Sequence, residues 1–286
     1  MINNYLGDSV INPVNALGDT LTSAYNHLGD LIYSGSSDQD YSSYTITHLF
    51  SIGSGCQDMG YYNGKIYQFT SSGSFTVYNM DGSVSSSGSG SVGHNNSTIF
   101  NLREFPTNYN IPYLFSTDTV YPVRIYKNRI SPTTCIVSDT FSVPDGNGYC
   151  GSFCFDFKNG IGYFIAHSTN SAASPETIIS IWDFNSITMI DNIGYPSFIS
   201  SVTVTAIGVI QGAEFRNGKV FVAIGGTGQI PRLVILNPTT GVIEHTITVS
   251  DQTIEAEGLA FIDDFNILFV LQNRDYYKIT FDEMQP

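Results

Sequence analysis

Carboxylate, amide and imidazole side chains recur in this 286-residue chain at the starts of short segments that share one pattern. Carboxylates and imidazole transfer protons near neutral pH when their surroundings shift their pKa values, and they also bind metal ions. If the segments are equivalent in the fold, these side chains converge on one site. The candidate binding residues are Gln57, Asp58, His94, Asn95, Asn96, Ser152, Gln211 and Glu257.

Two explanations of this polar set stay open. It forms a binding or catalytic site, or it is polar because water fills a central channel. His-x-His and Glu-x-x-His spacings, which mark dedicated metal sites, do not occur in the sequence. We therefore expect neither a metal nor a cofactor.

The segments that carry these residues form a weak repeat. Residues Gln57–Tyr67 align without gaps on Gln211–Phe221, and each contains an Asn-Gly pair, the strongest short signal of a β-hairpin. Glu257–Phe269 and Ser152–Tyr163 are further copies, and His94–Phe115 is a divergent fifth. Each copy predicts an inner strand, a turn and a returning second strand.

Further strands follow each copy, such as Ile178–Trp182 and Leu233–Leu236, with a clear fourth strand at Val242–Val249. A repeat of four strands is typical of a propeller blade, and five blades from residue 44 onwards give about 49 residues per blade. The last copy has three strands, whereas Tyr44–Phe50 precedes the first copy without a partner. We expect an all-β, five-bladed β-propeller in which Tyr44–Phe50 completes the last blade.

The N-terminal residues have a different pattern, with Asn-x-Leu-Gly-Asp recurring every 11 residues. Asn12-Pro13 is typical of a helix start, and apolar residues follow at spacings of three and four. We therefore predict an N-terminal helical segment with a linker over residues 1–40, and the propeller over 41–286. The helix either packs on its own domain or joins copies or a larger assembly. Its assembly residues would be Val14, Leu17, Leu21, Tyr25, Leu28, Leu31 and Ile32.

Charge excludes two classes of partner. Lys plus Arg total 11 against 25 Asp plus Glu, for a net charge of −14, which argues against binding nucleic acid or an anionic membrane. Neither a membrane span nor a signal peptide is visible, so we expect a protein that is cytoplasmic at synthesis or one whose leader has been removed. Four cysteines in a chain of this length are expected to be buried thiols.

Residues Gln211–Phe215, Asn237–Gly241 and Glu257–Phe261 resemble propellers of the glutaminyl-peptide cyclotransferase-like group and, less closely, gluconolactonase-like propellers. The cyclotransferase resemblance implies a carboxylate at the channel mouth and several tryptophans. This chain has the carboxylates of Glu257 and Glu214 but a single tryptophan, Trp182, which we expect to pack within a blade. The composition also resembles tail- or capsid-attached proteins of bacteriophages.

Three functions are compatible with these features. The first is a non-enzymatic attachment protein, fixed through residues 1–40 to protein partners, as in a phage tail or capsid, or to its own copies. Such a protein in a virion would bind a host-surface glycan or protein, and Asn108–Tyr113 offers an aromatic surface for this. The second is a channel-mouth enzyme, cyclotransferase-like or sugar-acting, with Glu257 as acid or base and His94 and Asp58 assisting. The third is a sensor of a small ligand. The absence of a catalytic motif favours the first.

Overall fold

A computed structural model describes residues 2–3, 9–10, 23–25, 31–34, 41–53, 55–90, 95–118, 123–143, 149–167, 176–205 and 207–282. In these residues the fold is all-β, as predicted, and no helix there has the length and apolar character that crossing a bilayer requires. The chain divides into two compact units, one of residues 45–280 and one of residues 1–44 with 281–286.

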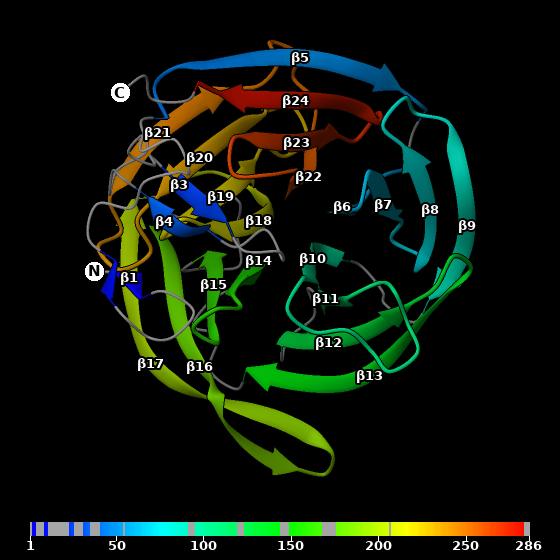
Figure 1. The fold of residues 1–286 in the computed structure, drawn as a ribbon. Coiled ribbons are helices and arrows are strands. Elements are labelled where there is room, and N and C mark those ends of the chain that lie inside the picture. The colour runs from blue at the N-terminus through cyan, green and yellow to red at the C-terminus, as the bar shows by residue number, and fades with distance from the viewer. Residues whose placement is uncertain are drawn as a thin grey trace. The chain divides into compact units, whose positions relative to one another are not determined.

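The larger unit is a five-bladed β-propeller, with its blades arranged in a ring around a central axis (Figure 1). Each blade is an antiparallel sheet of four strands, innermost strand first. The first two blades are β6 (Asp58–Tyr62), β7 (Lys65–Phe69), β8 (Ser74–Asn79) and β9 (Val84–Gly90), then β10 (Asn95–Asn101), β11 (Tyr113–Asp118), β12 (Val123–Ile130) and β13 (Thr134–Val143). The third and fourth are β14 (Tyr149–Asp156), β15 (Ile161–His167), β16 (Glu176–Ile190) and β17 (Ile193–Thr205), then β18 (Ile210–Arg216), β19 (Lys219–Ile224), β20 (Arg232–Leu236) and β21 (Ile243–Thr248).

The fifth blade closes the ring with strands from distant parts of the chain. Its order is β22 (Ala256–Phe261), β23 (Asn266–Leu271), β24 (Asp275–Phe281) and β5 (Tyr44–Ser51), so β5 is the outer strand predicted from the sequence. Pairing with β5 covers an edge of β24 that would otherwise be open to other chains.

Tight turns join the inner strands to the second strands. At Asn63-Gly64 and Asn217-Gly218 all four residues have positive φ, between 48° and 77°. Two consecutive positive φ values define the turn whose twist matches a two-residue hairpin, and asparagine and glycine adopt them at the lowest cost. The Asn-Gly signals therefore specify the hairpins β6–β7 and β18–β19.

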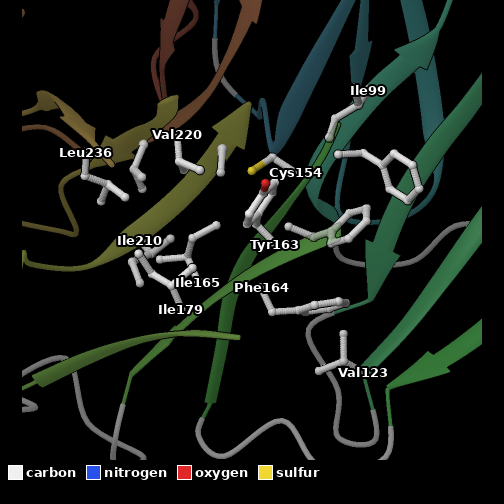
Figure 2. Close-up of a cluster of buried hydrophobic side chains, with 14 of the residues drawn as sticks. Ile99, Val123, Cys154, Tyr163, Phe164, Ile165, Ile179, Ile210, Val220 and Leu236 are labelled. Atoms are coloured by element: carbon white, nitrogen blue, oxygen red, sulfur yellow. The ribbon is translucent and has the colours of Figure 1, made fainter. Parts of the chain in front are cut away.

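The core lies between neighbouring blades. One cluster of buried side chains, shown in part in Figure 2, is formed by the second, third and fourth blades and includes Ile165, Ile179 and Val220, none of which is exposed. Trp182 belongs to the same cluster and is 2% exposed, which confirms its predicted role in packing. Cys56, Cys135 and Cys154 are buried free thiols, as expected.

The smaller unit contains two short strand pairs, β1 (Ile2–Asn3) with β2 (Ser9–Val10) and β3 (Ser23–Tyr25) with β4 (Leu31–Ser34). The predicted helix is therefore wrong where it includes Tyr25, Leu31 and Ile32. Asn26–Asp30, between β3 and β4, has the Asn, Gly and Asp of a turn, and Gly29 costs a helix about 1 kcal/mol relative to Ala. The other predicted assembly residues, Val14, Leu17, Leu21 and Leu28, lie outside the described residues. The predicted boundary at residue 40 stays a prediction.

Candidate functional site

The starts of β6, β18 and β22 bring predicted site residues together near the axis of the ring. The Gln57 side chain, just before β6, donates a hydrogen bond from Nε2 to Oε2 of Glu257 at 3.2 Å. These residues are 200 positions apart, and their contact joins the first blade to the fifth. The inner strands therefore begin at one end of the axis, which we call the mouth.

Glu257 is the most buried carboxyl group of the mouth after Asp58. It lies where β22 bulges, between Ala256 and Gly258, and is 3% exposed. Burial and, to a smaller extent, the nearby carboxylate of Glu255 together raise the pKa of Glu257 to about 9, against the lowering effect of a hydrogen bond from Gln272. Glu257 is therefore protonated at neutral pH and can both donate and accept hydrogen bonds.

Glu255 is surrounded by hydrogen-bond donors. Its carboxylate accepts hydrogen bonds from Nε2 of Gln211 at 2.5 Å, from Nε2 of Gln272 at 3.0 Å and from Oγ1 of Thr227 at 3.2 Å. The backbone N–H of Gln272 also donates to the carbonyl oxygen of Glu255 at 2.9 Å. These contacts fix Glu255 and, through Gln272, the neighbouring Glu257.

Asp58 lies against Gly258 and is 1% exposed. A Cβ atom on Gly258 would be 2.0 Å from Oδ1 of Asp58, and one on Gly212 would be 2.9 Å from Cα of Gly258. Two glycines thus let the inner strands of three blades approach the axis. Burial raises the pKa of Asp58 well above its ordinary value, although the backbone N–H of Met59 and the Thr98 hydroxyl oppose the shift. Asp58 Oδ2 has no hydrogen-bond partner among the described residues.

The remaining predicted residues have other surroundings. The Ser152 hydroxyl lies 2.6 Å from that of Ser97, whose oxygen also accepts a hydrogen bond from the backbone N–H of Phe153 at 2.7 Å. Ser152 thus links the second and third blades. Asn95 and Asn96 belong to β10, but their side chains are not described, and His94 lies outside the described residues. The role of His94 stays a prediction.

Besides Gln272 and Thr227, three residues near the site were not predicted from the sequence as site residues. The buried Tyr276 donates a hydrogen bond from its hydroxyl to Oε1 of Gln68 at 2.6 Å. Burial raises the pKa of the neighbouring Cys56 well above its ordinary value, and the charges of Glu257 and Asp58 raise it further. Gln68 and Tyr276 lie within apolar strands, where the sequence pattern indicates core, and only their pairing distinguishes them.

A further carboxyl group, Glu214, lies two residues from the end of β18. Burial raises the pKa of Glu214 to about 7, against the lowering effects of the Arg216 charge and of a hydrogen bond from the backbone N–H of Phe261. At the end of the strand Arg216 forms an ion pair with Asp264, with Nη1 and Oδ1 3.4 Å apart. No group of three His, Cys, Asp or Glu side chains in the described ranges is arranged to hold a metal ion.

Neither a family model nor a curated protein matches the chain. Among solved structures, the glutaminyl cyclase of Myxococcus xanthus has a similar fold, with a TM-score of 0.52 and 12% sequence identity. The similarity covers 84% of this chain and 97% of that chain. At this identity it shows a shared propeller fold.

This finding corrects the first functional hypothesis. The hypothesis of a non-enzymatic attachment protein was based on the apolar residues of the N-terminal segment, the acidic composition and the absence of a catalytic motif, whereas the similar solved structure is that of an enzyme. The resemblance to bacteriophage proteins has no support in the comparisons, because it was based on composition, which reflects surface chemistry rather than fold.

Proposed function

We propose that the protein is an enzyme of the glutaminyl cyclase type and that Glu257 is its catalytic acid and base. The observation that carries the proposal is the burial of Glu257 at the mouth, where its pKa is raised to about 9. Residues with strongly shifted pKa values are concentrated at functional sites, because proton transfer requires a pKa near the working pH. The similar fold of a glutaminyl cyclase supports this choice of chemistry.

The proposed substrate is a peptide with an N-terminal glutamine. The positively charged α-amino group first loses one proton to water. Its neutral nitrogen then attacks the carbon of the side-chain amide of the same residue, a C–N bond forms, and the C–N bond to the side-chain nitrogen breaks, so that this nitrogen leaves as ammonia. Protonated Glu257 donates its proton to the departing nitrogen. The resulting carboxylate then takes the proton that the attacking nitrogen loses, so Glu257 ends the reaction as it began.

The neighbours of Glu257 support this role in different ways. The side-chain amide of Gln57 donates a hydrogen bond to the carboxyl group of Glu257 at 3.2 Å. The side-chain amide of Gln272 is hydrogen-bonded both to Glu257 and to Glu255, and so connects the two carboxyl groups. The carboxylate of Glu255 attracts the positively charged amino group of an arriving peptide, as does the net charge of −14. We assign Asp58 a positioning role, because its carboxyl group is packed against Gly258.

Ammonia release from synthetic peptides tests this function. We expect the full chain to release ammonia from a peptide that begins with glutamine and to convert it to the cyclised product, detected by mass spectrometry. The same peptide with an acetylated amino group should not react, because its nitrogen is not nucleophilic. Ammonia release from both peptides would indicate a different hydrolytic reaction, and release from neither would contradict the proposal.

A further inference from the structure

The third blade carries a hairpin that extends beyond its own sheet. Its strands β16 and β17 have 15 and 13 residues, and no other strand in the described ranges has more than 10. We call residues 185–201 the arm, which extends outward past the ring of blades in Figure 1. The turn of the arm, Asp191-Asn192, has two positive φ values, 50° and 63°, as a two-residue hairpin requires. Residues 185–192 and 197–201 are all exposed.

One edge of the arm is covered and the other is open. Ile193 and Gly194 of β17 pair with Thr140 and Phe141 of β13 in the second blade. The contact is close, because a Cβ atom on Gly194 would be 2.6 Å from a ring carbon of Phe141. On the other edge, β15 pairs with β16 only up to the base of the arm, so residues 186–190 have no strand partner there among the described residues. The second blade therefore holds the arm in place and leaves one strand edge open.

The open edge is apolar and carries little charge. Ile187, Met189 and Ile190 are 37%, 62% and 53% exposed. The arm has a single charged residue, Asp191, and the sequence has neither lysine nor arginine from residue 159 to residue 215. Lysine and proline are common devices that protect an open strand edge from other chains, and neither occurs in residues 185–190. This edge is therefore suited to pairing with a strand of another chain.

The charge of the arm indicates which partner it fits. A bilayer is disfavoured, because the polar Asp191-Asn192 turn would have to enter the hydrocarbon first. A basic protein would bind where carboxylates are dense, whereas the arm has only one. An uncharged strand edge fits the arm, and a second copy of the chain supplies such an edge. Because two copies repel each other through a net charge of −14 each, they approach most easily where charge is lowest.

We propose that two copies form a dimer in which the open edges of β16 pair antiparallel, centred on Thr188. Both copies then use the same surface, as a two-fold interface requires. This register places Ile187 of each copy opposite Met189 of the other, and apolar pairs of this kind stabilise a sheet. It also places Asp191 opposite Asn185, so that carboxylates do not face each other. The dimer does not involve the mouth and is independent of the function proposed for Glu257.

The mass of the full chain in solution tests the dimer. Light scattering should give about twice the chain mass of 31.3 kDa. Thr188→Lys places two like charges opposite each other at the centre of the interface and should give the monomer. Because Thr188 is exposed, urea unfolding should show that this variant is as stable as the unmodified chain. As a control, Val84→Lys changes an exposed valine of the first blade and should leave the dimer intact.

Cysteine cross-linking tests the register. Residues directly opposite each other in antiparallel strands have Cα atoms about 4.5–5.5 Å apart, which is within the range of a disulfide. Thr188→Cys should therefore give a disulfide-linked dimer under mild oxidation, whereas the unmodified chain should not. Ser186→Cys should not cross-link either, since the two copies of this exposed residue would be about 13 Å apart along the strands.

Several results would overturn the proposal. They are a monomeric unmodified chain, a dimer that survives Thr188→Lys, and a Ser186→Cys variant that cross-links as readily as Thr188→Cys. Failure of Thr188→Cys to cross-link would overturn it as well. A monomer that binds phosphatidylcholine vesicles, and loses that binding in Thr188→Lys, would assign the arm to a membrane instead. Glu257→Gln should remain a dimer, so loss of ammonia release and loss of the dimer are separate results.

Discussion

At the scale of single residues, Glu257 combines two properties that a surface glutamate lacks. It is almost completely buried, and it is hydrogen-bonded to Gln57 beside the carboxylate of Glu255. Both burial and the second carboxylate disfavour the charged form, so the folded protein holds the proton to about pH 9. The proton is therefore available for transfer at neutral pH.

This raised pKa makes stability depend on pH in a defined direction. The pKa of Glu257 is about 9 in the folded protein against an ordinary value of 4.5, so the folded state binds the proton more tightly than the unfolded state. The contribution of the Glu257 proton to the free energy of unfolding is fully present below about pH 4.5. It is lost as the pH rises to about 9, at up to about 1.4 kcal/mol per pH unit. Urea unfolding of the unmodified chain and of Glu257→Gln over this pH range should show that the free energy of unfolding decreases less for the variant.

An exposed glutamate provides the control. Glu176→Gln, at the start of β16, should keep the pH dependence of the unmodified protein. If Glu257→Gln and the unmodified protein lose stability in parallel from about pH 5 to about pH 9, the Glu257 proton is not held as described.

At the scale of elements, glycine brings the inner strands close enough to build the mouth. Gly258 leaves room for Asp58, and Gly212 lies against the backbone of Gly258. Sequence reasoning predicted the inner strands from the Asn-Gly hairpins and the recurring polar starts. It could not predict the bulge at Glu257 or the Gln272 and Tyr276 contacts, because these depend on which strands the ring places side by side.

Gly258→Ala tests this close approach. The new Cβ would lie 2.0 Å from Oδ1 of Asp58, and overpacking of this kind costs about 1–3 kcal/mol of stability. We expect Asp58→Ala combined with Gly258→Ala to recover part of that loss, because it removes the colliding carboxyl group. A double-mutant cycle by urea unfolding measures the coupling. Independent, additive effects of the two substitutions would show that the two residues are not in contact.

The closing strand is a second prediction at this scale. A chain that begins at Tyr41 retains β5, whereas a chain that begins at Gly53 lacks it and leaves β24 as an open edge. We expect the first to melt cooperatively and to stay monodisperse in size-exclusion chromatography. The second should melt at a lower temperature or aggregate. Equal melting temperatures would mean that β5 contributes nothing to closure of the ring.

At the scale of the whole molecule, the sequence indicated architecture better than function. Four-strand repeats with turn signals specify a propeller, because each blade needs the same alternation of strands and turns. Function could not be derived in the same way, since a propeller serves binding and catalysis equally well and no motif marks its mouth. The helix prediction failed at β3 and β4, where periodic apolar residues are also compatible with short paired strands.

The central claim is that Glu257 transfers the proton in cyclisation of an N-terminal glutamine. The most direct measurement compares kcat/KM for a glutaminyl peptide between the unmodified chain, Glu257→Gln and Glu176→Gln. General acid–base catalysis contributes about 10²–10⁴-fold, so we expect Glu257→Gln to lose at least about 100-fold while it stays folded. Glu176→Gln should keep its rate. A Glu257→Gln variant that retains the rate of the unmodified protein would contradict the account.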